Sequence, residues 1–198
     1  MLKVINNIKK FTDGIKLILI STFQLKKFKF GFYLILRFFF DTLFIYSTII
    51  QKYKKIKIEF DNKVNKNYNL SYNWFGNNVQ IWFHYLKILN FLDKKKIKFL
   101  EIGSFEGLSI LYLSYLYGDR IEIDSVDILK KNTKHYKNFL KNTKNIKKLT
   151  FFNMWSKDFF AKAHKEKQYD IIYIDASHYY EDVFFDAKKS FQLLKKRG

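Results

Sequence analysis

An acidic residue and a histidine follow an apolar, β-branched run at residues 169–174, where they could bind a cation and move a proton. The segment reads Asp175-Ala176-Ser177-His178. A carboxylate there can hold a cation or face a charged ligand, and an imidazole can accept a proton near neutral pH. The alternative is structural: Asp175 or Ser177 caps the next helix, and His178 is a surface residue. The acids that follow are expected in an exposed first helical turn, which suits the helix dipole: Glu181, Asp182 and Asp186.

A glycine-containing turn follows a second apolar run, at residues 97–102. Its residues are Glu101, Gly103, Ser104, Phe105, Glu106 and Gly107. Gly103 permits a sharp turn, and Gly107 permits the next helix to approach closely, so that exposed amides can face a ligand. The G-x-x-x-G spacing differs from the G-x-G-x-x-G of dinucleotide-binding proteins, and a plain tight turn is the alternative.

A third candidate is Asp127, which ends the run at residues 121–128. An acid at the end of such a strand can accept hydrogen bonds from both ribose hydroxyls of a nucleoside. Asp127 lies 24 residues after Gly103, near the roughly 20 residues expected for this arrangement. A lone acid at this place is more often a helix cap, but together with Glu101 and Gly103 it favours a nucleoside site.

Strands and helices alternate from about residue 72 onward. Strands are predicted at residues 97–102, 121–128, 149–153 and 169–174. Helices are predicted at 79–89, 108–117, 130–140, 157–164 and 183–194. This alternation predicts an α/β fold with a Rossmann-like, doubly wound parallel sheet. Ligands of such sheets bind beyond the carboxyl ends of the strands, which places the chemistry after Ile102, Val126, Asn153 and Ile174.

Composition excludes several classes of protein. The 198 residues contain no Cys, which excludes a disulfide scaffold, a thiolate metal site and a Cys nucleophile. The formal net charge of +19 is typical of proteins that bind polyanions. However, only three of the 37 basic residues are Arg, and Pro is absent. Lysine excess of this kind indicates an AT-rich coding sequence with solvated lysines, and it argues against a nucleic-acid partner because phosphate readers favour Arg.

The first 68 residues are predicted to form a basic, apolar helical extension. Residues 1–60 contain 12 basic residues and three acids, a net charge of +9. The apolar run at residues 30–50 is interrupted by Arg37 and Asp41, one helical turn apart. Three alternatives stay open: peripheral contact with an anionic membrane, packing on the domain or on a second copy, and a membrane span. Residues 61–69 are predicted to be a polar linker.

The order of the motifs FLEIGSFEG, SVD and YDIIYIDASHYYEDV resembles the class I S-adenosylmethionine (SAM)-dependent methyltransferases. It is most similar to the type 24 family, which carries a D-G-S-H motif and is related to macrocin and catechol O-methyltransferases. The resemblance covers residues 74–198, and "NWFGNNVQIW" is similar to the family's first helix. It implies a methyltransferase domain at residues 69–198.

The resemblance also implies roles for individual residues. The turn around the methionine part of SAM would comprise Glu101, Gly103, Ser104, Phe105 and Gly107. Asp127 would hold the ribose, and Ser156 would lie near the adenine. Asp175 corresponds to a metal ligand of the metal-dependent relatives, which implies a Mg²⁺ site, and His178 corresponds to a candidate base. Ala176 replaces the usual Gly.

The chain ends at Gly198, where the family's fifth strand and its Asp-Asp pair would begin. We therefore expect an incomplete sheet, half of a metal site and a truncated domain. The expected reaction is methyl transfer to an oxygen or nitrogen of a small molecule or glycan, in the cytoplasm or at the inner face of the membrane. The alternatives are a nicotinamide-dependent oxidoreductase and a non-catalytic basic protein.

Overall fold

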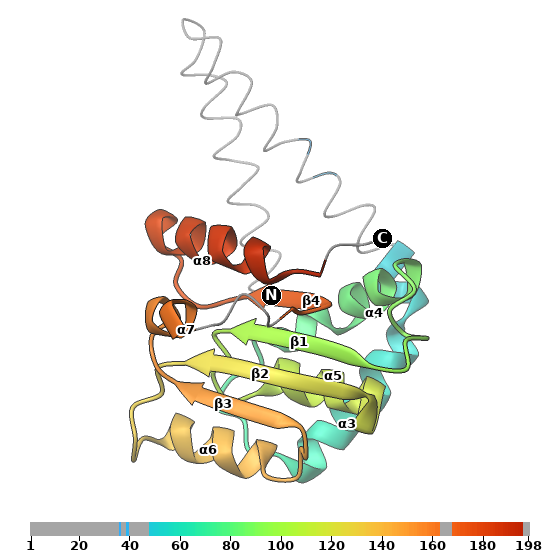
Figure 1. Ribbon diagram of the computed structural model, residues 1–198. Helices are drawn as coiled ribbons and strands as arrows, with labels where there is room; N and C mark the ends of the chain where they lie inside the picture. The colour runs from blue at the N-terminus through green and yellow to red at the C-terminus, as the bar shows by residue number, and fades with distance from the viewer. Residues whose placement is uncertain (1–35, 37–38, 40–47, 163–167, 196–198) are drawn as a thin grey trace, which may run out of the picture. The chain divides into compact units, whose positions relative to one another are not determined.

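Four parallel strands form one sheet in the part of the chain that the computed structural model describes, residues 36, 39, 48–162 and 168–195 (Figure 1). The strands are β1 (Ile97–Ile102), β2 (Ile121–Asp127), β3 (Leu149–Asn153) and β4 (Ile171–Ile174), in the order β3-β2-β1-β4. In the register, Ile102 lies opposite Val126 on β2 and Ile174 on β4. This order confirms the predicted Rossmann-like α/β sheet and places its switch point between β1 and β4.

Helices cover both faces of the sheet, because alternate side chains of β1 point to opposite sides. On one face, Phe99 packs with Leu113 of α5 (Leu108–Tyr117) and Phe139 of α6 (Lys134–Thr143). On the other face, Leu100 packs with Phe159 of α7 (Ser156–Lys162) and Leu193 of α8 (Tyr180–Leu193). The remaining elements are α3 (Lys54–Asn67), η2 (Phe75–Asn78), α4 (Val79–Ile88) and η3 (Gly118–Arg120).

The predicted linker at residues 61–69 is wrong over residues 61–67, which belong to α3. Phe60 and Val64, four residues apart, are buried on one side of this otherwise polar helix and pack with Tyr112 of α5. The rings of Phe60 and Tyr112 meet edge to face with centroids 5.0 Å apart. Two apolar anchors one turn apart are therefore sufficient to hold a lysine-rich helix against the domain.

The boundaries of two further helices differ from the predictions. α6 begins at Lys134 rather than at residue 130, because the Thr133 hydroxyl accepts the Tyr136 amide and caps the helix there. α8 begins at Tyr180, three residues earlier than predicted.

The chain divides into two compact units, residues 1–55 and 56–198. Most of the predicted apolar helix at residues 30–50 lies outside the described residues. Within the described ranges, no helix is long and apolar enough to cross a membrane. The division at residue 68, the peripheral membrane contact of residues 1–60 and the cytoplasmic location stay predictions.

Candidate cofactor and acceptor cleft

A cleft of about 460 Å³ opens at the carboxyl ends of β1, β2 and β4. It brings together six of the predicted site residues, which come from three separate turns: Gly103, Ser104, Phe105, Asp127, Asp175 and His178. Glu101, Gly107 and Ser156 do not line it. The cleft lies where the strand order reverses, which is the general ligand site of open α/β sheets.

Two glycines of the turn after β1 are required by close contacts. A Cβ on Gly103 would lie 2.4 Å from the Asp175 carbonyl oxygen, and the residue has φ +90°. Gly107 has φ +83°, and its Cβ would lie 3.0 Å from the Thr143 side chain on α6. Gly103 therefore lets the turns after β1 and β4 touch, and Gly107 lets α6 pack close to the start of α5.

Asp127 fixes the same turn through its carboxylate. Its Oδ2 accepts the backbone amides of Ser104 at 2.8 Å and Phe105 at 2.7 Å, and its Oδ1 accepts the Ile128 amide at 2.6 Å. Phe105 has φ +47°, which is uncommon outside glycine, and the amide contact holds it there. Oδ2 uses both of its lone-pair sites on the two amides, whereas Oδ1 keeps one site for a further donor at the cleft, which Asp127 lines.

Glu101 is a fully buried acid beneath the cleft. The Ser109 hydroxyl, which itself lines the cleft, donates to Glu101 Oε1, whereas Oε2 has no hydrogen-bond partner among the described residues. Burial raises the pKa of Glu101 to about 8; the Ser109 hydrogen bond opposes the rise, and the charges of Asp127 and Asp175 add to it. Three carboxyl groups thus influence one another at the base of the cleft, which favours a cationic ligand.

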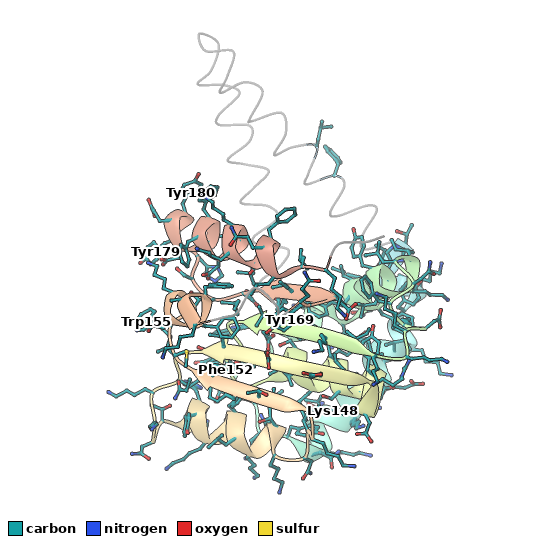
Figure 2. All side chains as sticks on the ribbon, viewed as in Figure 1. Lys148, Phe152, Trp155, Tyr169, Tyr179 and Tyr180 are labelled. Atoms are coloured by element: carbon teal, nitrogen blue, oxygen red, sulfur yellow. The ribbon has the colours of Figure 1, made fainter. Side chains whose placement is uncertain are left out.

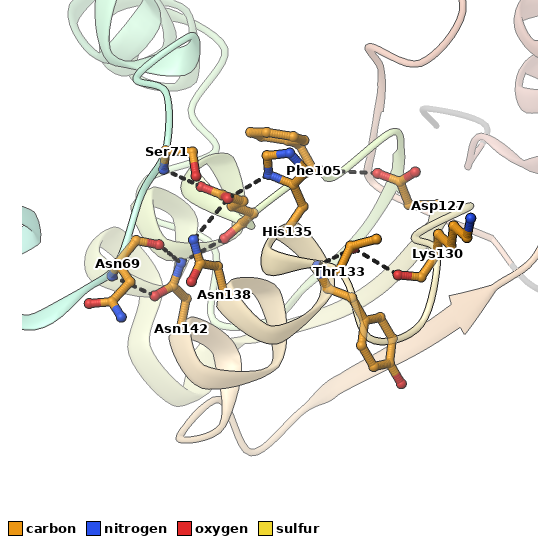
Figure 3. Close-up of polar contacts among 11 residues, drawn as sticks. Asn69, Ser71, Phe105, Asp127, Lys130, Thr133, His135, Asn138 and Asn142 are labelled. Atoms are coloured by element: carbon orange, nitrogen blue, oxygen red, sulfur yellow. Dashed lines mark hydrogen bonds and ion pairs between the residues drawn. The ribbon is translucent and has the colours of Figure 1, made fainter.

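Glu106 lines the cleft and is held by Ser71, His135 and Asn138 (Figure 3), a role that the sequence analysis did not predict. Its Oε2 accepts the Ser71 amide, and its Oε1 lies 2.8 Å from His135 Nδ1 and 2.9 Å from Asn138 Nδ2. Burial of Glu106 opposes ionisation, but these hydrogen bonds outweigh it, and the pKa of Glu106 is lowered. Asn142 exchanges two hydrogen bonds with the Asn69 backbone and reaches the Glu106 carbonyl as well.

The segment held by Glu106 presents aromatic side chains to the cleft. Tyr72 and Trp74 stack with ring centroids 5.2 Å apart, and Trp74 lies 4.7 Å from the Phe105 ring. Both Tyr72 and Trp74 line the cleft and are more than half exposed. They form an aromatic wall that continues from Phe105 in the turn after β1. The only signal of this wall in the sequence was its place before the first helix of the domain.

The turn after β4 carries the candidate base. Asp175 and His178 are both exposed and line the cleft, and Asp175 accepts the Tyr173 hydroxyl at 2.7 Å. Ser177 accepts the Tyr179 amide and donates to Asp182. The alternative in which Asp175 or Ser177 caps the next helix is wrong, because the N-cap of α8 is Tyr179 and no side chain caps it. The described residues contain no group of three acidic or histidine side chains able to hold a metal. The expected Mg²⁺ site at Asp175 stays a prediction, and we derive no step through a cation.

Ser156 lies away from the cleft, at the start of α7. Its hydroxyl bonds Asp186 of α8, and burial raises the pKa of Asp186 despite that bond. Asp186 is buried, so its predicted place in an exposed first turn is wrong. The two residues join the helices that cover one face of the sheet. The role of Ser156 near an adenine stays a prediction.

Comparison with known proteins identifies the family. The model of a family described as a methyltransferase domain, of type 24, matches residues 100–198. Uncharacterized protein R132 of Acanthamoeba polyphaga mimivirus is 30% identical over 135 residues, which cover 64% of this chain and 60% of that protein.

Comparison with solved structures shows a similar fold in one of them. A protein assigned as an O-methyltransferase from Klebsiella pneumoniae superposes with a TM-score of 0.50 at 11% identity, over 80% of this chain and 66% of that one. An O-methyltransferase from Bacillus cereus, solved in complex with SAH, gives a TM-score of 0.44 at 15% identity, over 80% and 67%. This chain thus spans less than two thirds of the mimivirus and Klebsiella proteins. The family match over half of the chain confirms the resemblance seen in the motifs: this protein belongs to the type 24 family of SAM-dependent methyltransferases.

Proposed function

We propose that this chain binds SAM in the cleft and transfers its methyl group to an oxygen, or a nitrogen, of a small-molecule or glycan acceptor. The observation that carries the proposal is the set of three carboxyl groups, Glu101, Asp127 and Asp175, around one cleft at the switch point of the sheet. SAM carries a sulfonium and an ammonium group, so these acids complement its charge.

The residues after β1 and β2 are suited to hold the cofactor. The methionine part would lie against the turn at Gly103 and Ser104, with the Ser109 hydroxyl as a polar partner and the carboxyl group of Glu101 beneath it. Asp127 would accept a ribose hydroxyl at the Oδ1 lone pair that the Ile128 amide leaves free. When bound, SAM supplies an electrophilic methyl group, so the protein must mainly align the acceptor and remove its proton.

The residues after β4 are suited to the acceptor. His178 is exposed in the cleft wall and would take the proton from the acceptor hydroxyl, which leaves an imidazolium and a more nucleophilic oxygen. Asp175, fixed by the Tyr173 hydroxyl, would stabilise that imidazolium. The aromatic wall of Tyr72 and Trp74 would place the apolar face of an acceptor ring and exclude water.

Calorimetry with S-adenosylhomocysteine tests the cofactor site. Asp127→Ala should weaken binding about 10- to 100-fold, because the ribose hydroxyls lose a charged acceptor worth roughly 1.5–3 kcal/mol. Asp119→Ala is the matched control, since Asp119 lies just before the other end of β2 and is largely exposed. Thermal unfolding of both variants separates loss of the site from loss of the fold. Unchanged affinity in Asp127→Ala, or tight binding of NADH instead, would contradict the proposal.

A further inference from the structure

Large aromatic side chains are exposed at the end of the sheet where the cleft opens. Trp155 is 61% exposed, Tyr179 77%, Tyr180 74% and Phe184 57%. Figure 2 shows Trp155, Tyr179 and Tyr180 on the same side of the molecule, at the end toward which the strands point. We call these four residues the aromatic rim.

The rim residues lie at the starts of two helices that an ion pair joins. Trp155 precedes α7, and Tyr179 and Tyr180 begin α8. Lys157 and Asp182 form an ion pair of 3.3 Å between the first turns of these two helices. Tyr180 and Phe184 stack with their ring centroids 5.9 Å apart and their planes within 14°. The starts of α7 and α8 therefore present their aromatic rings side by side.

The rim adjoins the cleft directly. His178 lines the cleft, and Tyr179 follows it in the chain. The Ser177 hydroxyl accepts the Tyr179 amide at 3.2 Å and donates to Asp182 at 2.8 Å, which fixes the turn between the cleft and the rim. Whatever binds the rim therefore lies next to the opening through which an acceptor enters.

Exposed lysines continue this surface beside the rim. Residues 128–157 contain nine lysines and no acidic residue. Among them, Lys130, Lys131 and Lys134 are exposed around the β2–α6 loop. This loop is held beside the end of β3, two residues before Trp155, because the Asn153 side chain bonds both the amide and the carbonyl of Leu129. The first turns of α7 and α8 add the acids Asp158, Glu181 and Asp182, of which Asp182 is paired with Lys157.

We propose that the aromatic rim and the flanking lysines dock this chain on an anionic lipid surface, with the cleft opening toward it. Amphipathic Trp and Tyr rings favour the interface between lipid headgroups and acyl chains, and nearby lysines are attracted to anionic headgroups. This surface is separate from residues 1–60, whose predicted membrane contact involves other side chains.

A polynucleotide fits this surface less well. The rim and its loop contain no Arg, the side chain whose planar fork best matches phosphate. Arg120, the one arginine among the described residues, donates instead to the backbone carbonyls of Leu92, Lys94, Leu116 and Tyr117. This inference about the acceptor rests on the proposed function. If the cleft opens toward lipid, the acceptor is a hydroxyl or amine of a lipid-anchored molecule.

Tryptophan fluorescence tests the docking without any need for cofactor or activity. The full chain is mixed with anionic vesicles whose acyl chains are brominated near the headgroup, and the quenching of its tryptophans is measured. We expect clear quenching that Trp155→Phe removes in large part. Trp82→Phe is the control and should keep the quenching, because Trp82 packs against Phe75 and Tyr173. Trp74 is also exposed, so only the part of the quenching that Trp155→Phe removes reports the place of Trp155. Attachment through residues 1–60 alone would leave that part absent and would overturn the proposal.

Binding of the variants to the same vesicles tests the two components of the surface. Lys130→Ala with Lys131→Ala should weaken co-sedimentation about 10-fold at low salt and much less at high salt. The matched control is Lys95→Ala with Lys96→Ala, an exposed lysine pair just before β1, at the opposite end of the sheet. Tyr180→Ser should weaken binding, whereas Phe191→Ser should not, because Phe191 is equally exposed but lies three turns further along α8.

Three results would overturn the proposal. The first is equal loss in the rim variants and their controls. The second is a preference for RNA over vesicles that the Lys130 and Lys131 changes abolish. The third is a dimer in solution that Tyr180→Ser dissociates without any effect on vesicle binding. Cofactor affinity is measured separately from vesicle binding. Absence of vesicle binding would therefore leave the proposed function intact, and unchanged cofactor affinity in Asp127→Ala would leave the proposed lipid docking intact.

Discussion

The turns after β1 and β4 border the same cleft but are built in opposite ways. In the turn after β1, Gly103 and Phe105 adopt positive φ, Asp127 holds two amides, and Glu101 and Glu106 are buried. In the turn after β4, Asp175, His178 and Tyr179 are exposed, and Tyr173 and Ser177 supply the hydroxyl contacts. The difference teaches that a rigid, strained turn, as after β1, suits a ligand that never changes. Exposed side chains, as after β4, suit a ligand that varies.

The largest effect is expected from a side chain placed where the two turns are in contact. Gly103→Ala puts a Cβ 2.4 Å from the Asp175 carbonyl oxygen and forces alanine into φ +90°. We expect a loss of about 3 kcal/mol or more in the free energy of unfolding, measured by urea denaturation.

Gly118→Ala is the matched control for Gly103→Ala. Gly118 also has positive φ, at +55°, but an added Cβ meets no atom within 4 Å. This variant should cost only the backbone strain and therefore less than Gly103→Ala. Equal losses in the two variants would mean that contact between the turns contributes nothing.

The next variant tests the buried acid of the rigid turn. Burial raises the pKa of Glu101 from an ordinary 4.5 to about 8, so the folded state holds this proton more tightly than the unfolded state. The stability contributed by that proton is present below pH 4.5 and is lost as the pH rises toward 8. Glu101→Gln carries no such proton and removes this loss. The free energy of unfolding of the variant minus that of the wild type should therefore be about 1–4 kcal/mol larger at pH 8 than at pH 5.

The same variant should lose cofactor affinity, about 10-fold or more, because the ammonium group would lose a charged partner. In the wild type, a cationic cofactor favours the ionised form of Glu101. Its binding at pH 7 should therefore release, on average, a fraction of a proton per molecule. Calorimetry in buffers of different ionisation enthalpy measures that release, which should vanish in Glu101→Gln. A variant that binds as tightly as wild type and leaves the proton release unchanged would show that Glu101 contributes nothing to cofactor binding.

The fold was largely predictable because its strands are short apolar runs with polar ends. β1 and β3 begin and end as predicted, and β2 ends one residue earlier than predicted. The start of α6 was missed because Lys130 and Lys131 suit a helix, whereas the Thr133 cap decides where it begins. A linker was predicted in place of the last half of α3 because burial of Phe60 and Val64 against α5 overrides a polar local sequence.

The site was predictable only where residues directly follow strands. Gly103, Asp127, Asp175 and His178 meet in one cleft because the sheet aligns the ends of their strands. Glu106 was not predictable, since its partners Ser71, His135 and Asn138 lie 29 to 35 residues away in the sequence. Ser156 was placed by family resemblance alone, and nothing in its local sequence signalled the bond to Asp186 of α8.

The smallest effect on the fold is expected at the free turn. His178 is exposed, and no hydrogen bond or ion pair joins it to another residue in the described part of the chain, so His178→Ala should change the free energy of unfolding by less than about 0.5 kcal/mol. Affinity for S-adenosylhomocysteine should also stay as in wild type. Transfer of a radiolabelled methyl group from SAM to a lipid extract should fall about 100-fold or more, because the acceptor keeps its proton. His135→Ala gives the contrast, since His135 bonds the buried Glu106 and its loss should cost about 1 kcal/mol of stability. If His178→Ala costs as much stability as His135→Ala and leaves methyl transfer unchanged, the division between a rigid cofactor turn and a free acceptor turn does not hold.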